Sequence, residues 1–498
     1  MELPFEGKSC GVWRESLYRT ERIRVDLEGV VPDVNDDVGR IACVQCNVLL
    51  KSKEITESGL RVGGKLECLL LCITENADAV QTVKLHREFE TEIGTDGMKL
   101  GEAQVSLRVL RIEPRVLNPR KLSASVELGC TVTGWSRDEQ LLSLLPQEGD
   151  ESLLCGLAGR SDMQPVTTIT EKSFAVSESF TFPESGAAVL RILGGEAKVY
   201  LQEHSRIGSR LIVKGSTEIR LLCEVEGQCF PIVHHFSAPI SQILDVGSDN
   251  ICCCTLQCET TSLFFSLTDS IGGGQAADAE IHAVLQFAGR KNEVFECLKD
   301  AYSNQMPLHQ TMDLMVLPQC SEMSRSSAEA SELLAVAEDC AEILSVLSSV
   351  SLDGSMPRAE LDILYRSKMG EIAAVHRQVP LKGEAVPEGA RILDVKLTRC
   401  DLQPEGEGIQ CELQSSLLWQ TVGEKEETMV STVTLEEEHP YNPAAFPAVT
   451  LVRAEEESDW ELAKAYHSRI SEIEALNGAD SRKGRMLLIP RCGLQNEK

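Results

Sequence analysis

The sequence is poor in aromatic residues and in basic charge, and it has no long apolar run. Phe, Trp and Tyr make up 4% of the 498 residues, so a core must be built from Leu, Val, Ile and Cys. Lys and Arg number 48 against 77 acidic residues, and the net charge of −29 makes nucleic acid and anionic lipid surfaces poor partners. Apolar runs stay far below the ~18 residues of a membrane span, so we expect no membrane insertion.

An export signal is not expected, because the first ten residues carry Glu2 and Glu6 and no apolar segment. The 19 cysteines are interpreted as reduced thiols, since many occupy strand positions that Val or Ile would otherwise fill. Together these features predict a protein of the cytoplasm whose cores contain buried cysteine.

Patterns that carry catalytic or cofactor chemistry are missing or incomplete. Residues 59–65 have the spacing of a phosphate-binding loop, but Leu66 stands where Mg²⁺ binding needs Ser or Thr. We interpret Gly63 and Gly64, and likewise Gly215, as turn glycines between short strands. Esterase and zinc-protease motifs do not occur, so we expect no enzyme activity and no cofactor.

Two groups of cysteines raise the question of a metal site. Cys43 and Cys46 are three residues apart, and in a strand such residues point to opposite faces. Cys252, Cys254 and Cys258 share a strand face, but they lack the paired Cys-x-x-Cys of structural zinc sites. Buried thiols are the favoured interpretation, and no metal is predicted.

An internal repeat organises the chain. Residues 60–72 align with residues 211–223 at an offset of 151, and apolar residues alternate within each copy. Such period-two alternation indicates a strand with one buried face. A third, divergent copy is indicated by residues 360–365, which match residues 218–223. The predicted fold is therefore mainly β, with tandem, sandwich-like sheet repeats.

Short connecting helices are expected between the copies. Apolar residues fall at helical spacing over residues 292–302, and residues 326–346 are rich in Ala, Glu and Leu without Gly or Pro. Candidate linkers are residues 146–165 and 439–447. The resulting division gives three β repeats at 1–145, 166–305 and 326–438, and a separate tail at 448–492.

The tail has its own pattern of strand, helix, helix and strand. Ser458 or Asp459 is the expected cap of the first helix, and Asn477 with Gly478 stops the second. Residues 448–498 carry 8 basic and 9 acidic residues, so nearly all the net negative charge lies upstream. The strands are expected at residues 450–453 and 484–490, and the helices at residues 460–466 and 470–476.

This tail resembles a LysM module, whose pattern runs Trp, apolar-Ala-Lys-x-Tyr, a helix, Asn and Gly-x-x-Leu-x-Ile-Pro. Here these are Trp460, residues 462–466, Asn477 and residues 484–490. The resemblance implies a βααβ fold. The family's sugar-lining loop is Gly-Asp-Thr-Leu, whereas the stretch 456–459 is bulkier and more acidic, and the opposite end of the tail is basic. This charge pattern favours protein docking over the binding of neutral sugars.

We therefore predict a partner-binding surface on the tail. Trp460 is expected either to pack in the core and shape the acidic loop, or to anchor the partner directly. The predicted partner-binding residues are Glu457, Ser458, Asp459, Trp460, Ile470, Asn477, Gly478, Arg482, Lys483 and Arg485.

The upstream copies resemble SPOCS domains, the repeats of bacterial spore-coat proteins. The resemblance rests on residues 31–33, 39–41, 174–178 and 298–303. SPOCS repeats followed by LysM are the layout of SipL-like spore-coat morphogenetic proteins. That family implies a non-enzymatic scaffold of the mother-cell cytoplasm, recruited to the forespore surface.

In such a scaffold, the LysM module would dock on the coat-basement ATPase, stage IV sporulation protein A. The β repeats would bind other coat components. The alternative is a wall or cortex protein that uses LysM on the N-acetyl sugars of peptidoglycan.

Overall fold

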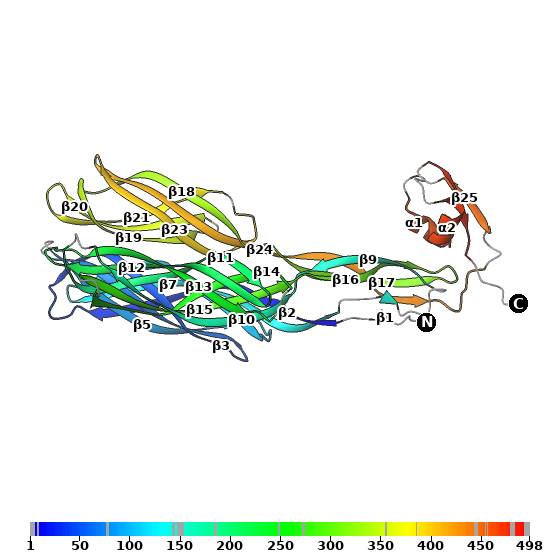
Figure 1. Ribbon diagram of the computed structural model, residues 1–498, viewed down its shortest axis with the longest axis horizontal. Helices are drawn as coiled ribbons and strands as arrows, with labels where there is room; N and C mark the ends of the chain where they lie inside the picture. Colours follow the sequence, from blue (N-terminus) through cyan, green and yellow to red (C-terminus); the bar gives the residue numbers. More distant parts are fainter. Residues whose placement is uncertain are drawn as a thin grey trace.

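The structure, a computed structural model, is built almost entirely of antiparallel strands (Figure 1). It describes residues 5–492 except 7–8, 76–78, 142–144, 147–153, 184–186, 248–249, 271–273, 354–355, 385, 443–446, 454, 456 and 479–483. Within these residues there are two helices, α1 (Asp459–Ala465) and α2 (Ile470–Asn477), and neither is long and apolar enough to cross a membrane. The predicted mainly-β fold is confirmed.

Three sets of strands form the body, and each set consists of two facing antiparallel sheets. The first set is β2 (Ser9–Val30), β3 (Val38–Ile55), β4 (Gly59–Thr74), β5 (Val80–Gly94), β6 (Glu102–Asn118) and β7 (Lys121–Leu141). The second set is β10 (Val166–Thr181), β11 (Val189–Ile207), β12 (Arg210–Val225), β13 (Ile232–Asp245), β14 (Ile251–Asp269) and β15 (Gln275–Lys291). The third set is β18 (Ser324–Ala335), β19 (Cys340–Asp353), β20 (Met356–Ser367), β21 (Ile372–Pro380), β23 (Ala390–Glu405) and β24 (Gly408–Leu435).

The sheets have the same order in every set. The second, third and fourth strands form one sheet, and the first, last and fifth strands form the other. Alternating apolar side chains fill the space between the two sheets, as predicted. Leu66 and Cys68 lie in the first core, Ile219 in the second, and Leu361 and Ile363 in the third. Each set is therefore a sandwich with its own core.

The register of the strands shows that the sets are copies of one another. β4 and β12 begin and end 151 residues apart, which is the offset of the sequence repeat. The pairing of the second strand with the third is shifted after Ile41, after Ile192 and after Ile343. A β-bulge bends and twists its strand, so bulges at equivalent places give the three sets a common shape. The divergent third copy is thus a structural repeat as well.

The prediction of helices between the copies is wrong. Residues 293–302 form the strand β16 (Glu293–Tyr302), and residues 326–346 belong to β18 and β19. In β16 a bulge after Leu298 switches the buried side of the strand, so its apolar residues mimic helical spacing. In β18, Ser326 and Ala328 are buried and alternate with exposed residues. The pairing of β18 with β24 therefore overrides the helix propensity of Ala and Glu.

The turns predicted at the glycine pairs are also wrong. β4 runs without interruption through Gly63 and Gly64, and β12 runs through Gly215. A Cβ atom at Gly215 would lie 2.1 Å from the carbonyl oxygen of Tyr200 on the neighbouring strand. Glycine is needed there because the backbones approach closely, not because the chain turns.

The three sets meet in a shared interior. Leu71, Leu222 and Leu364 lie in the middle strands of the three sets, and all three belong to one buried cluster. These side chains point out of their own sandwiches and toward the other two sets. The body is therefore held together by a central core in addition to the three sandwich cores.

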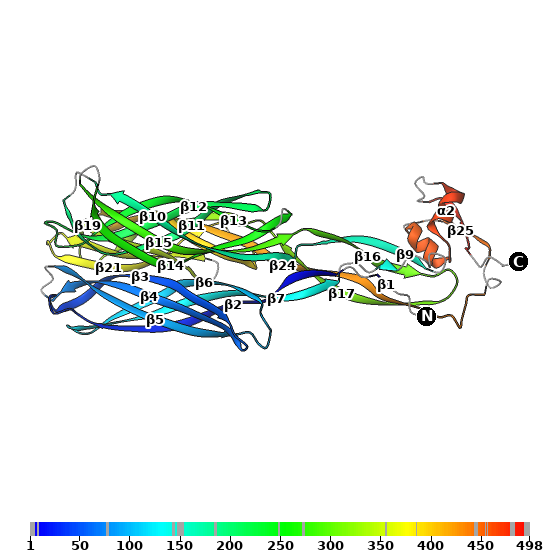
Figure 2. The ribbon, with the colours of Figure 1, turned by 60° about the horizontal axis from the view of Figure 1, so that its bottom comes forward.

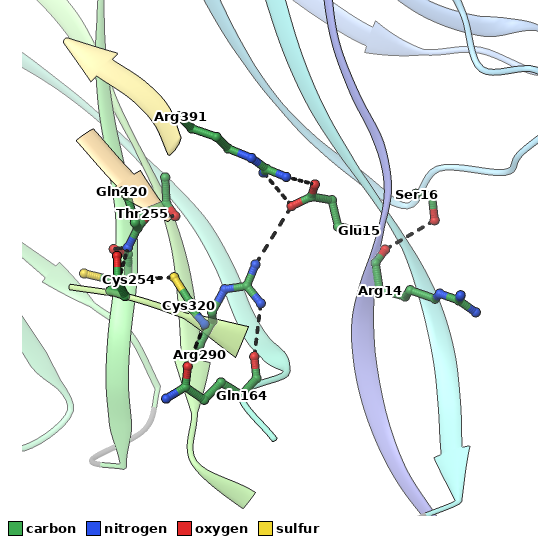
Figure 3. Close-up of polar contacts among 11 residues, drawn as sticks. Arg14, Glu15, Ser16, Gln164, Cys254, Thr255, Arg290, Cys320, Arg391 and Gln420 are labelled. Carbon is green, nitrogen blue, oxygen red and sulfur yellow. Dashed lines mark hydrogen bonds and ion pairs between the residues drawn. The ribbon is translucent and has the colours of Figure 1, made fainter. Parts of the chain in front are cut away.

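An ion-pair network also joins the three sets (Figure 3). Glu15 of β2 accepts a hydrogen bond of 2.8 Å from Arg391 of β23 and lies 3.9 Å from Arg290 of β15. Arg290 is 4% exposed, and its guanidinium also donates to the carbonyl of Gln164 at 3.0 Å. Removing one partner would leave a buried charge uncompensated, so this network requires all three sets to be in place.

A narrow stalk extends from the body (Figure 1). It pairs β9 (Cys155–Met163) with β16, and β17 (Leu308–Cys320) with the last part of β24. Met163, Leu317 and Met429 are among the side chains that pack between the two ribbons. The predicted linker 146–165 is thus partly strand. Three short pairings complete the sheets. β1 (Phe5–Glu6) pairs with β8 (Leu145–Pro146), and β22 (Lys382–Gly383) pairs with β18. β2 pairs with β10 at Trp13 and Val166, which joins one sheet of the first set and one of the second into a single six-stranded sheet.

A small C-terminal unit lies at the far end of the stalk (Figure 2). Its elements follow in the order β25 (Val449–Arg453), α1, α2 and β26 (Met486–Pro490), and the two strands pair antiparallel. Residues 443–446 of the second predicted linker lie outside the described residues.

Candidate functional site

The acidic stretch before α1 is shaped by a capping box. The Ser458 hydroxyl accepts the N–H of Glu461 at 3.2 Å, and the Glu461 carboxylate accepts the N–H of Ser458 at 2.7 Å. The N–H and the hydroxyl of Ser458 both donate to the Glu461 carboxylate and hold its pKa below its usual range. Ser458 is thus the helix cap, and its side chain serves the fold.

Asn477 ties the second helix to the last strand. Its amide nitrogen donates to the carbonyls of Ile473 at 2.8 Å and Leu488 at 2.7 Å, and its amide oxygen accepts the N–H of Leu488 at 2.8 Å. Gly478 follows with a φ of 75°, a conformation that favours glycine. Both residues therefore end α2, as predicted, and the side chain of Asn477 is occupied within the unit.

The core of the C-terminal unit includes a residue of the stalk. Leu462, Ile473 and Leu487 pack with Tyr302 of β16 in one buried cluster. The Tyr302 ring meets the ring of Trp460 edge to face at 4.9 Å, and its hydroxyl donates to the carbonyl of Ser468 at 2.9 Å. The unit is therefore docked on the stalk through part of its own core.

Asp300, also on β16, accepts hydrogen bonds from the stalk and from the C-terminal unit. Three side chains donate hydrogen bonds to the Asp300 carboxylate: the indole N–H of Trp460 at 2.8 Å, the ammonium of Lys464 at 2.7 Å and the amide of Gln310 at 2.9 Å. Burial alone would raise the pKa of Asp300, but the hydrogen bonds from Lys464, Trp460 and Gln310 lower it below its usual range. Trp460 thus contacts the stalk with its ring and with its N–H.

The predicted partner-binding residues are distributed over different roles. Trp460 and Asn477 make contacts within the protein, and Asp459 and Ile470 are half-buried. Arg482 and Lys483 lie outside the described residues. The predicted residues that are described and solvent-exposed are Glu457, Ser458, Gly478 and Arg485.

Sequence reasoning missed an apolar face on the two terminal strands. Val449 and Leu451 of β25 and Met486 and Leu488 of β26 point outward and are 48%, 58%, 54% and 44% exposed. Leu451 and Leu488 are direct cross-strand partners. The signal was in the sequence, because both strands are apolar at consecutive positions and one face alone packs on the helices.

Most of the cysteines lie in strands, as predicted, whereas Cys229 and Cys492 lie outside them. Cys43 belongs to the central cluster and Cys46 packs in the first sandwich core, so they face opposite sides as expected. Among the described residues, no group of His, Cys, Asp and Glu side chains is placed to hold a metal ion.

Comparison with protein-family models, with curated proteins and with solved structures gives no match to this chain. The resemblance to SPOCS and LysM domains therefore rests on the residues that carry it.

Proposed function

We propose that this chain is a non-enzymatic scaffold of the SipL-like spore-coat type. In this proposal the β sets are SPOCS repeats, and the C-terminal unit is a LysM-like module that docks on stage IV sporulation protein A at the forespore surface. The support is the sequence pattern of the tail together with the order of its elements.

The observation that carries the proposal is the outward apolar face of β25 and β26. Four large apolar side chains lie together on a unit at the tip of the stalk. Exposed apolar groups that cluster on a small surface mark protein interaction sites. Arg453, which is exposed on the same two strands, and Arg485 next to them add positive charge at the edge. A positively charged rim favours an acidic protein partner over neutral sugars.

The position of the unit supports the same role. The stalk separates it from the three sandwiches (Figure 1). In this proposal the sandwiches bind the other coat components. Two partners could thus be held at once without overlap, which is what a scaffold requires.

The test uses the full chain and purified stage IV sporulation protein A. Replacing both Leu451 and Leu488 by Ser should weaken binding at least tenfold, because apolar groups at the centre of an interface dominate affinity. Leu333→Ser is the matched control, since Leu333 is also 58% exposed but lies on β18 of the body. It should leave binding unchanged.

Two results would count against the proposal. Equal binding by the double variant and the control would remove the apolar face from the interface. Saturable retention of the full chain on purified peptidoglycan, lost in the same double variant, would favour the wall-binding alternative.

A further inference from the structure

The body encloses a cavity where the three sets meet. Its volume is about 830 Å³, within the range of pockets that hold small organic ligands. Exposed residues in its wall, among them Arg22, Ser349 and Gly389, show that it opens to solvent.

The cavity is lined by equivalent positions of the repeats. Leu49 of β3 and Tyr200 of β11 lie 151 residues apart, and Ser351 lies a further 151 residues along on β19. The fifth strand of each set, β6, β14 or β23, lines it as well. The cavity therefore exists only when all three sets are assembled.

Much of the cavity wall is apolar, and its charged side chains are mostly cationic. The apolar side chains include Leu49, Leu107, Val199, Leu256, Val350 and Leu393. Five cations and three acids line it, whereas the whole chain has 48 cations and 77 acids. The excess of cations over acids in the wall, in a protein whose net charge is negative, favours a negatively charged ligand.

Most of the cations in the wall have a carboxylate partner. Lys198 pairs with Asp394 at 2.7 Å, and Arg220 pairs with Glu196. Arg108 on β6 differs. Among the described residues its guanidinium has no carboxylate at ion-pair distance, and it donates to the carbonyl of Leu393.

Glu259 on β14 is the acid in the wall best placed to tolerate an anion beside it. Its carboxylate accepts the N–H of Leu107 at 3.2 Å. Burial raises the pKa of Glu259 to about 7, against the lowering effects of Ser106, Leu107 and Arg108. Near neutral pH a protonated Glu259 can donate a hydrogen bond to a bound anion and does not repel it.

We propose that the central cavity binds a small amphipathic anion, a carboxylate with an apolar body, whose charged group pairs with Arg108 while its body lies among the leucines and valines of the wall. A ligand seated there touches all three sets, so it stabilises the assembled body by binding the folded state alone.

The probe is decanoate below its micelle concentration, added to the full chain at neutral pH. Calorimetry should show saturable binding at about one site, and decanoate should raise the thermal unfolding temperature. Decylammonium, which has the same chain and the opposite charge, should do neither. Arg108→Met should weaken decanoate binding at least tenfold, since it keeps a flexible, unbranched side chain and removes the charge.

Two further variants make the test decisive. Arg111→Met removes a cation from the same strand, but Arg111 does not line the cavity and its side chain is 65% exposed, so binding should be unchanged. Arg108→Lys should retain part of the affinity if charge is what matters. Absence of decanoate binding to the unaltered chain, equal binding of decylammonium, or equal losses in Arg108→Met and Arg111→Met would each overturn the proposal.

Discussion

At Asp300, donors from two separate parts of the chain converge on one carboxylate. Gln310 belongs to the stalk, whereas Trp460 and Lys464 belong to the C-terminal unit, so this side chain fixes the direction in which the unit points. Charge-assisted hydrogen bonds are about twice as strong as neutral ones, and a charged donor left half-buried without a partner is unfavourable.

Asp300→Ala should therefore loosen the C-terminal unit and leave the body intact. The loss of docking should be roughly 2 kcal/mol. Amide hydrogen exchange in α1 should accelerate, and the Trp460 emission should shift to longer wavelength as its indole meets water. Asp313→Ala, an exposed change on the neighbouring strand β17, is the control and should do neither.

The same contact predicts a pH response of the unaltered chain. The pKa of Asp300 in the folded protein is lowered from 3.8, so its contribution to stability is present above pH 3.8 and is lost as the pH falls through the folded value. Protection factors in α1, which correct exchange rates for their intrinsic pH dependence, should therefore fall as the pH is lowered below 3.8. Equal protection of α1 at pH 2 and at neutral pH would contradict this.

Glu259 predicts the opposite pH response. Its folded pKa of about 7 lies above the ordinary 4.5, so the folded state holds a proton that the unfolded chain has released between these values. Its cost to stability is absent below pH 4.5, grows as the pH rises and levels off above pH 7. Arg108 and Lys198 face the carboxyl from β6 and β11, and their charges limit the rise in its pKa.

Glu259→Gln should remove that cost. In urea unfolding, the gain in stability of the variant over the unaltered chain should be larger at pH 8 than at pH 5, by about 2 kcal/mol. A gain that does not change between the two pH values would show that Glu259 is already ionised at pH 5.

Among the elements, the middle strand of the second set depends on close approach to its neighbour. In β12, Gly215 faces the carbonyl oxygen of Tyr200 on β11 at a distance that leaves no space for a side chain. β11 also has a bulge directly after Leu201, which re-aims the strand at this place.

Gly215→Ala should destabilise the protein by about 2 kcal/mol or more, because the added methyl collides with backbone that cannot move aside. Gly94→Ala on β5 is the matched control, since a Cβ there meets nothing within 4 Å, and it should be neutral. Equal denaturation midpoints for both variants would show that the sheet relaxes around the methyl group.

These elements also show which local features a sequence can predict. Alternation found the strands around Leu66 and Ile219 and their buried faces, and cap residues found the ends of the two helices. It failed at residues 292–302, because a bulge switches the buried side of a strand and imitates a helix. The prediction of a turn at Gly215 was also wrong. Glycine is required both where the chain turns and where two backbones approach closely, so the sequence alone does not distinguish these cases.

At the scale of the whole molecule, the repeat offset predicts that there are copies but not how they surround one another. The wall of the cavity includes residues that differ between copies, such as Leu49, Tyr200 and Ser351, so no common motif marks it. The cavity and the ion pair of Glu15 with Arg391 could not be predicted from the sequence, because each requires the assembled body.

The central cluster predicts that the three sets unfold together. Leu222 is 1% exposed and contacts a cluster to which all three sets contribute. Leu222→Ala should lower the free energy of unfolding by about 2 to 5 kcal/mol, as truncation of a buried leucine does. Because the cavity left behind weakens a core common to the body, the most protected amides of β4, β12 and β20 should lose protection equally, although the substitution lies in the second set alone.

Hydrogen exchange measured strand by strand under native conditions checks this, since it resolves the free energy of opening of each region. Leu190→Ala is the control, because Leu190 lies in the same set on β11 but is 55% exposed, and it should leave all three strands unchanged. If Leu222→Ala accelerates exchange in β12 and not in β4 and β20, the sets open one at a time. The central cluster would then be a contact between independent sandwiches, and the cavity could open without unfolding the body.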